Sequence, residues 1–227
     1  MQIPGEDFTE MFASVVKFAI LWIFLALVAY LDWDLEQIDI VAAFLNGELE
    51  EKIYMQVPEE FKRFGNGKMY WKLLKALYGL KQAGRQWKIK LNKVLLELGF
   101  VKSIADDCLY LLQKSGKIIL MVLVYVDDMA VASPWCSGKI RWFTLKLGDH
   151  FEITELGELR HILGLVVTRN RSEKTIHISQ TAYIHKMLVH FGMEGATPIS
   201  TPLAVKHNFS TAQSPVTDDE KAPELCW

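Results

Sequence analysis

Three aspartates in this chain occupy positions where carboxylates can do chemistry. Asp127 and Asp128 are adjacent and interrupt an apolar stretch that runs over residues 118–132. Asp39 interrupts a second apolar stretch, residues 38–44. Mg²⁺ takes hard oxygen ligands and is usually held by one or two carboxylates together with substrate phosphates. Two such ions, bridged by carboxylates, would activate a hydroxyl nucleophile and stabilise a leaving pyrophosphate, which is the chemistry of nucleotidyl transfer.

Two predicted strands position these acids. Residues 118–126 have the length and the β-branched content of a buried strand, and residues 129–132 suit its antiparallel return, so the Asp-Asp pair would lie at a hairpin tip. The strand predicted over 38–44 carries Asp39, whose burial costs free energy unless it is paired or binds a metal. Simpler interpretations stay open, because an Asp pair is also a common turn sequence and Asp39 also suits the solvent end of a strand.

Composition excludes several classes of protein. The chain has 227 residues, 51% of them hydrophobic, which is enough for one sizeable core or two small subdomains. Its three cysteines lack a Cys-x-x-Cys spacing, which argues against a disulfide framework and a cysteine zinc site and favours a reducing compartment. The N-terminus has no basic segment followed by a cleavage site, so we expect no signal peptide and an intracellular protein.

One apolar segment, residues 18–31, raises the question of a membrane. It has 14 residues, whereas a membrane span needs about 20, so the segment predicts a buried core helix and a protein without a membrane partner. A membrane-associated protein anchored by this segment is the weaker alternative.

Charge is unevenly distributed although the net charge is only −2. Residues 1–61 carry twelve acidic side chains against two lysines, whereas residues 62–102 carry eleven Lys or Arg against the single acid Glu97. Aromatic residues interleave with this basic segment, which suits phosphate contacts beside stacking platforms. Lys81 and Arg85 within it are the candidate contacts to a template and primer. A solvated helix face that balances the acidic half is the alternative.

The remaining pattern mixes helices and strands without a βαβ rhythm, which predicts the α+β class. Trp87, Leu91, Val94, Leu95 and Leu98 recur at helical spacing and predict a helix that ends at Gly99. The further predicted helices are 139–147 and 180–191, and the further predicted strands are 53–57, 69–73, 108–113, 151–153, 162–167 and 175–179. The proline-rich, polar residues 204–227 predict a poorly ordered tail.

Ten short motifs run in one order along residues 7–203. They are Phe8-Thr-Glu-Met-Phe12, Gln37-Ile-Asp-Ile40, Ala43-Phe-Leu-Asn-Gly47, Ile53-Tyr-Met55, Lys75-Ala-Leu-Tyr-Gly-Leu-Lys-Gln82, Leu98-Gly-Phe100, Tyr125-Val-Asp-Asp128, Leu156-Gly-Glu158 with Leu163-Gly164, Ile176-His-Ile-Ser-Gln180 and Ser200-Thr-Pro202. Together they resemble the reverse transcriptase domain of Ty1/copia-type LTR retrotransposon polyproteins, and the combination of Ala-Phe-Leu-Asn-Gly, Leu-Tyr-Gly-Leu-Lys-Gln and Tyr-x-Asp-Asp is highly specific.

The resemblance implies an RNA-directed DNA polymerase, which extends a primer with dNTPs on an RNA or DNA template. It implies a palm-and-fingers fold with an antiparallel palm sheet flanked by helices. Residues 1–203 would form the reverse transcriptase domain, with part of the fingers, the palm and the start of the thumb or connection. It also implies two Mg²⁺ ions, or Mn²⁺, held by Asp39 and Asp127 as main ligands, Asp128 as third acid and the carbonyl of Ile40.

The resemblance also implies roles around the metals. Phe44 would lie under the incoming sugar and favour dNTPs by clashing with a ribose 2′-hydroxyl, and Tyr78 and Gly79 would form part of the nucleotide-pocket wall. Tyr125 and Val126 would contact the primer terminus, and Leu163 and Gly164 would form a primer grip. For each of these apolar residues, plain core packing is the alternative.

Departures from the family pattern qualify these implications. Val41-Ala42 replaces the usual Lys-Thr, Gly84 replaces the usual Pro, and Trp22 stands where Arg is common. The basic fingers segment that would hold the triphosphate and a following RNase H segment are not in the sequence, so we expect truncated fingers and a fragment of an element. The alternative function is therefore a degenerate, inactive remnant that retains at most nucleic-acid binding. Location in a cytoplasmic particle or the nucleus would follow from the family, and the oligomeric state stays unassigned.

Overall fold

The computed structural model describes residues 2–3, 5, 7–58, 61, 70–198 and 214. Residues 62–69 of the basic segment, and the predicted tail 204–227 apart from Ser214, lie outside the described residues. The chain divides into two compact units, Met1–Gln180 and Thr181–Trp227, and each is described by itself.

Helices and strands alternate irregularly, as the α+β prediction requires, and every paired strand is antiparallel. In the second unit the described helix is α4 (Thr181–His190). The first unit contains α1 (Phe18–Leu31), β1 (Asp34–Ile40), the 3₁₀ helix η1 (Ala43–Asn46), β2 (Tyr54–Gln56), β3 (Tyr70–Lys72), α2 (Ala83–Glu97), β4 (Val101–Lys102), β5 (Leu109–Lys114), β6 (Lys117–Tyr125), β7 (Asp128–Ser133), α3 (Lys139–Gly148), β8 (Ile153–Glu158), β9 (His161–Ile162), β10 (Leu165–Asn170) and β11 (Thr175–Ser179).

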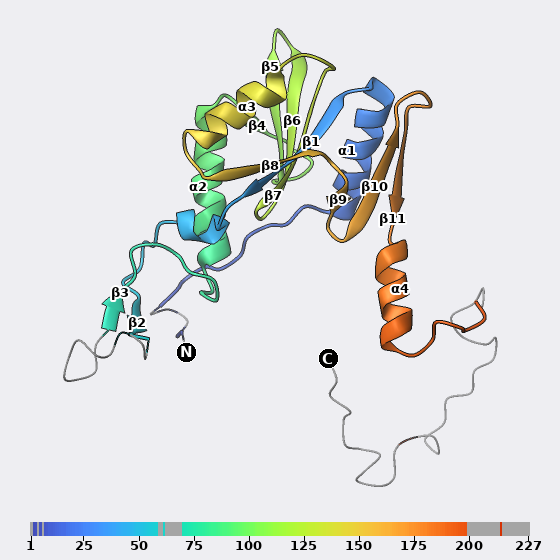
Figure 1. Ribbon diagram of the computed structural model, residues 1–227. Helices are drawn as coiled ribbons and strands as arrows, with labels where there is room; N and C mark the ends of the chain where they lie inside the picture. The colour runs from blue at the N-terminus through green and yellow to red at the C-terminus, as the bar shows by residue number, and fades with distance from the viewer. Residues whose placement is uncertain are drawn as a thin grey trace. The chain divides into compact units, whose positions relative to one another are not determined.

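A six-stranded sheet organises the first unit, in the order β4-β5-β6-β7-β1-β8 (Figure 1). Strands β6 and β7 form the hairpin at its centre, and β1 pairs with β7, so the two apolar stretches that carry the candidate acids are neighbours. A separate three-stranded sheet has the order β11-β10-β9, and β2 pairs with β3 in a small hairpin.

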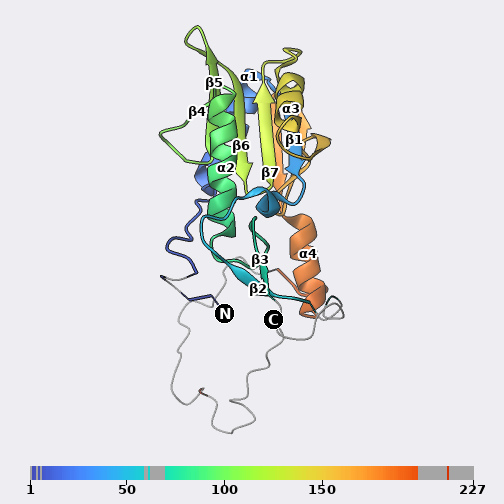
Figure 2. The same cartoon turned by 90° about the vertical axis from the view of Figure 1, so that its left-hand side faces the viewer.

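Two apolar clusters cover the two faces of the six-stranded sheet. Helices α2 and α3 pack on one face, where they enclose Ile38, Ile40 and Met129. Figure 2 shows these two helices in front of the sheet. On the other face, α1 and strands β9 to β11 pack over Leu35 and Leu123. Because successive strand residues point to opposite faces, β1 and β6 contribute to both clusters.

Helix α1 is buried on one side only. Its inner side carries the fully or almost fully buried residues Leu21, Phe24 and Val28. Its outer side carries Trp22, Ile23 and Tyr30, which are more than half exposed. The prediction of a helix is confirmed, and its packing into the core holds for the inner side alone. Among the residues that the structure describes, no helix is long and apolar enough to cross a membrane.

Three predicted strand boundaries were wrong. The strand predicted over 38–44 ends at Ile40, because Ala42, which directly precedes η1, adopts a left-handed conformation with φ of 50°. The strand predicted over 162–167 is broken by a turn at Leu163-Gly164, where both φ angles are positive. Strand β8 begins at Ile153, the last residue of the strand predicted over 151–153.

Candidate active site

The β6–β7 hairpin presents the Asp127-Asp128 pair through a two-residue loop. Tyr125 pairs with Asp128 across the hairpin, so Val126 and Asp127 form the turn. Val126 has a φ of 57°, a conformation that β-branched residues rarely adopt because of steric crowding. Such strained positions persist only where their surroundings hold them, and they concentrate at functional sites. The turn therefore requires external support.

Three hydrogen bonds provide that support. The indole Nε1 of Trp87 in α2 donates to the carbonyl oxygen of Val126 at 2.7 Å. The backbone N–H of Ile40 in β1 donates to the carbonyl oxygen of Asp127 at 3.0 Å. The side-chain amide of Gln37 donates to Oδ1 of Asp128 at 2.9 Å. Helix α2 and strand β1 thus hold both residues of the turn and Asp128, the first residue of β7.

Asp39 lies directly opposite Asp128 in the β1–β7 ladder. Burial raises the pKa of the Asp39 carboxyl, and the negative charges of Asp127 and Asp128 raise this pKa further. The Asp39 carboxyl therefore lies within electrostatic reach of the other two carboxylates. A divalent cation would relieve that repulsion, because an adjacent positive charge favours the ionised carboxylate.

The donor set fits Mg²⁺ in kind. Carboxylates from Asp39, Asp127 and Asp128 and the nearby backbone of Ile40 provide the hard oxygen atoms that this ion prefers. Within the described part of the chain, however, no three His, Cys, Asp or Glu side chains converge closely enough to hold an ion together. One Asp128 oxygen is instead engaged by the Gln37 amide. The oxygen donors therefore suit a metal ion, and the three aspartate side chains would have to rotate to bind one together.

The predicted nucleotide residues lie on two segments that meet. The rings of Phe44 in η1 and Tyr78 in the loop before α2 are 4.8 Å apart between centroids, tilted by 45°. Gly79 follows with a φ of 96°, which only glycine adopts readily. Phe44 and Val126 both line a cavity of about 170 Å³, so a predicted nucleotide residue and a predicted primer residue are neighbours.

A close approach explains the glycine that ends the Ala-Phe-Leu-Asn-Gly motif. Gly47 has φ of −70° and ψ of 130°, which any residue can adopt. A Cβ atom at this position would lie 2.9 Å from the backbone nitrogen of Trp87 and 3.1 Å from the carbonyl carbon of Gln86. Gly47 therefore lets η1 lie against the backbone of α2, which places Phe44 beside the helix that supports the turn.

The two basic residues assigned to template and primer differ in their surroundings. Lys81 is exposed, and its backbone N–H donates to the side chain of Gln2. Arg85 in α2 forms an ion pair with Glu10 at 2.5 Å. A nucleic acid that contacts Arg85 would have to compete with this carboxylate.

The predicted primer grip lies apart from the acids in the fold. Leu163 and Gly164 form the β9–β10 turn, with φ of 52° and 75°, in the three-stranded sheet. Leu163 packs against the same apolar cluster as Tyr125. The structure therefore brings Asp39, the hairpin and Phe44 together, and it connects the β9–β10 turn to them through packing.

Sequence reasoning missed the roles of Trp87 and Gln37. Trp87 entered it only as the first residue of an apolar helical stripe, and Gln37 only as part of a motif. Two general rules could have found them. Buried Trp usually donates its N–H to a partner, and a residue two positions before a strand carboxylate lies on the same face of the strand.

The first unit thus has an antiparallel sheet whose central hairpin carries two acids, one of them opposite a third acid on the neighbouring strand. The family model described as "Reverse transcriptase (RNA-dependent DNA polymerase)" matches residues 1–205, and the chain belongs to this family.

Relatives within the family are Pol polyproteins of copia-type transposons, which confirms the Ty1/copia resemblance. The chain is 40% identical over 224 residues to the retrovirus-related Pol polyprotein from transposon TNT 1-94 of Nicotiana tabacum, covering 97% of this chain. It is 37% identical over 204 residues to that from transposon RE1 of Arabidopsis thaliana, covering 89% of this chain. It is also 27% identical over 205 residues to the transposon Ty1-NL2 Gag-Pol polyprotein of Saccharomyces cerevisiae, covering 86% of this chain. The chain spans 16%, 14% and 11% of the length of these three relatives, respectively.

Proposed function

We propose that this chain is an RNA-directed DNA polymerase domain that extends a primer with dNTPs by two-metal nucleotidyl transfer. The observation that supports this most directly is the pairing of Asp39 with Asp128 in adjacent strands, together with the raised pKa of Asp39. A carboxylate placed against two others carries a cost that a bound cation would relieve. Membership of the reverse transcriptase family makes nucleic-acid synthesis the reaction that this arrangement would serve.

In this proposal Asp39 and Asp127 are the main ligands of two Mg²⁺ or Mn²⁺ ions, with Asp128 as the third acid and the Ile40 carbonyl as a further ligand. When bound, such ions lower the pKa of a primer hydroxyl and neutralise charge on the phosphates. Trp87 and Gln37 hold the hairpin so that the carboxylates keep their places. Rotation of the Gln37 amide away from Asp128 would free the second oxygen of that carboxylate.

The remaining residues would bind and orient the substrates. Phe44, Tyr78 and Gly79 would line the nucleotide pocket, with the Phe44 ring excluding a ribose 2′-hydroxyl. Tyr125 and Val126 would contact the primer terminus, and the Leu163-Gly164 turn would hold the primer strand. Lys81 and Arg85 would contact phosphates of the template and primer, with Arg85 leaving Glu10 to do so.

The architecture proposed for this activity is a palm with partial fingers. The six-stranded sheet with α2 and α3 would be the palm, and the β2–β3 hairpin would belong to the fingers. Residues 1–203 would form the reverse transcriptase domain, and the two-stranded template–primer would lie across the palm. The polyproteins in which relatives of this chain occur are several times longer, so the chain would act as one domain of such a protein.

Primer extension on poly(rA)/oligo(dT) with Mg²⁺ tests the proposal. We expect Asp127→Asn to lower the extension rate by about 10²–10³-fold, the loss typical of removing one group that stabilises a transition state. Asp149→Asn is the matched control, because Asp149 is an exposed acid that, among the described residues, forms its ion pair with Lys146 three residues before it. Extension that survives Asp127→Asn would refute the assignment of the metal site.

The inactive-remnant alternative predicts a different result from the same preparation. The wild-type chain would then bind template–primer in a salt-dependent manner and extend it no faster than Asp127→Asn. The left-handed Ala42, where the family usually has a polar residue, is the local feature that favours this alternative.

A further inference from the structure

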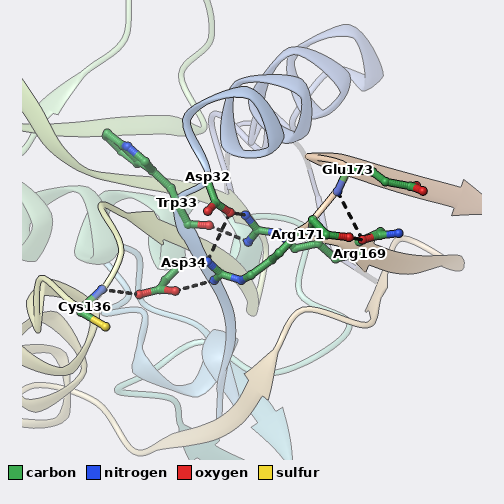
Figure 3. Close-up of polar contacts among 9 residues, drawn as sticks. Asp32, Trp33, Asp34, Cys136, Arg169, Arg171 and Glu173 are labelled. Carbon is green, nitrogen blue, oxygen red and sulfur yellow. Dashed lines mark hydrogen bonds and ion pairs between the residues drawn. The ribbon is translucent and has the colours of Figure 1, made fainter.

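A cluster of two aspartates and two arginines joins the six-stranded sheet to the three-stranded sheet (Figure 3). Arg169 donates from Nη2 to Oδ1 of Asp32 at 2.9 Å and from Nη1 to the carbonyl oxygen of Trp33 at 2.5 Å. Arg171 donates from Nη1 to the same Asp32 oxygen at 3.3 Å and from Nη2 to Oδ1 of Asp34 at 2.5 Å. We call these four charged residues the arginine clamp.

Arg169 is the most enclosed member of the arginine clamp. Its side chain is 6% exposed, whereas the side chain of Arg171 is 37% exposed. Leu165, Val167 and Arg169 alternate along β10 and therefore share one face of that strand. Leu165 and Val167 are buried in the cluster with α1, so Arg169 carries its guanidinium into the same interface. A buried charge is costly unless it is paired, and both terminal nitrogens of the Arg169 guanidinium donate hydrogen bonds.

The arginine clamp connects four segments of the first unit. Asp32 ends α1 in a left-handed conformation, Asp34 begins β1, and the arginines stand at the end of β10. Oδ2 of Asp34 also accepts the backbone N–H of Cys136 at 3.0 Å, and the Arg171 guanidinium lies 6.0 Å from the ring centroid of Trp135. The loop between β7 and α3 is thereby included.

Backbone pairing contributes little to the contact between the two sheets. The sheets share no ladder, and the β8–β9 connection contributes one backbone hydrogen bond, from Leu159 to the carbonyl oxygen of Leu35. Apolar burial holds the sheets together but does not depend on direction. The planar, forked guanidinium groups do fix direction, because each bond requires one relative orientation.

The arginine clamp binds two strands whose opposite ends belong to the candidate site. It binds β1 at Asp34 and β10 at Arg169, and the opposite ends of these strands carry Asp39 and the turn before Leu165. At about 3.3 Å per residue, these ends are roughly 13–17 Å from the clamp. Figure 1 shows the β6–β7 hairpin and the β9–β10 turn at the same end of the unit, opposite the β10–β11 turn.

We propose that Arg169 and Arg171 are positioning residues, which fix the orientation of the three-stranded sheet and so set the distance between the Leu163-Gly164 turn and the carboxylates of Asp39 and Asp127. This inference rests on the proposed function, since it gives the turn the task of holding the primer strand. Loss of the clamp leaves the apolar interface in place and lets the β9–β11 sheet rotate on it.

The decisive variants are Arg169→Met and Lys174→Met. Both remove one positive charge from the same hairpin and keep a long apolar side chain. Lys174 is exposed in the turn between β10 and β11, where its backbone N–H bonds to Arg171, and it is the matched control. Arg169→Lys keeps the charge but loses the fork, so it should restore only part of the function.

Steady-state primer extension separates positioning from general loss of stability. We expect Arg169→Met to raise the apparent KM for template–primer by about tenfold, the order of one coupled charged contact, while the KM for dTTP stays within about twofold. Arg169→Lys should lie between Arg169→Met and the wild type, and Lys174→Met should match the wild type. A purely structural role would instead lower the active fraction, and hence kcat, without changing either KM.

Hydrogen exchange of backbone amides tests the clamp without relying on activity. We expect Arg169→Met to speed exchange in β9, β10 and β11, with β6 and β7 unchanged. Exchange that rises equally in both sheets, or in neither, would overturn the proposal even in an active enzyme. A wild-type chain that extends no primer would refute the proposed function, and the exchange result would then still decide whether the clamp orients the sheet.

Discussion

Trp87→Phe removes the hydrogen bond that supports the strained turn of the β6–β7 hairpin and leaves most of the ring in place. The lost bond runs from Nε1 to the carbonyl oxygen of Val126 at 2.7 Å. Its net contribution is about 0.5–1.5 kcal/mol, and a carbonyl left without a partner costs about 1–3 kcal/mol. Val126 is only half-buried, so the lower end of the range applies.

Packing adds a second contribution to the cost of Trp87→Phe. The Trp87 side chain is 2% exposed, and its ring packs edge-on against Phe151 with centroids 5.1 Å apart. The smaller ring leaves a void in the cluster between α2 and the sheet, so the total loss of unfolding free energy should be about 2–4 kcal/mol. For a chain of this size, that corresponds to a fall in Tm of roughly 5–15 °C.

Two measurements distinguish support of the turn from packing alone. Thermal unfolding gives the stability, and single-turnover primer extension, normalised to the folded fraction, gives the chemistry. We expect the normalised rate to fall by about tenfold or more, because 1.4 kcal/mol of lost orientation at the acids is tenfold in rate. Trp142→Phe makes the same ring change in α3, at a partly buried residue of the same cluster. If the folded fraction of Trp87→Phe extends primers at the wild-type rate, the indole does not orient the acids.

Three further substitutions test the electrostatics and the packing around the site. In chelator, Asp39→Asn should stabilise the chain by about 0.5–1 kcal/mol near pH 7. The raised pKa means that the folded state binds the Asp39 proton more tightly, so wild-type stability falls as the pH rises above the ordinary value of 3.8. Urea titrations should therefore show the difference vanishing near that value, and Mg²⁺ should stabilise the wild type alone; a less stable variant at neutral pH would contradict the repulsion. Gly47→Ala should cost about 1–3 kcal/mol in the same titrations, because its Cβ would meet the backbone of α2 at 2.9 Å. Gly84→Ala should add about 0.5 kcal/mol, because its Cβ would meet Ala13 at 3.5 Å, an ordinary contact, in the first turn of α2.

Local sequence pattern alone predicted those elements that are marked by a run of apolar residues or by apolar residues at helical spacing. The hairpin of β6 and β7 follows from two apolar runs around an Asp pair, and α2 follows from an apolar stripe closed by Gly99. Boundaries failed where a single backbone conformation intervenes. Ala42 at a φ of 50° and the Leu163-Gly164 turn both interrupt runs that remain apolar through the break, so hydrophobic periodicity carries no information about them.

The three acids stand out in the sequence because carboxylates inside apolar strands are costly, and the cost is local. By itself the sequence determined the α+β class, the family, and Asp39, Asp127 and Asp128 as the residues of interest. Tertiary structure alone decided that Trp87 and Gln37 hold the hairpin, that Gly47 is required by the backbone of α2, and that Arg169 pairs with Asp32. Each of these contacts joins residues from different elements, and their geometry exists only after the sheet has brought those elements together.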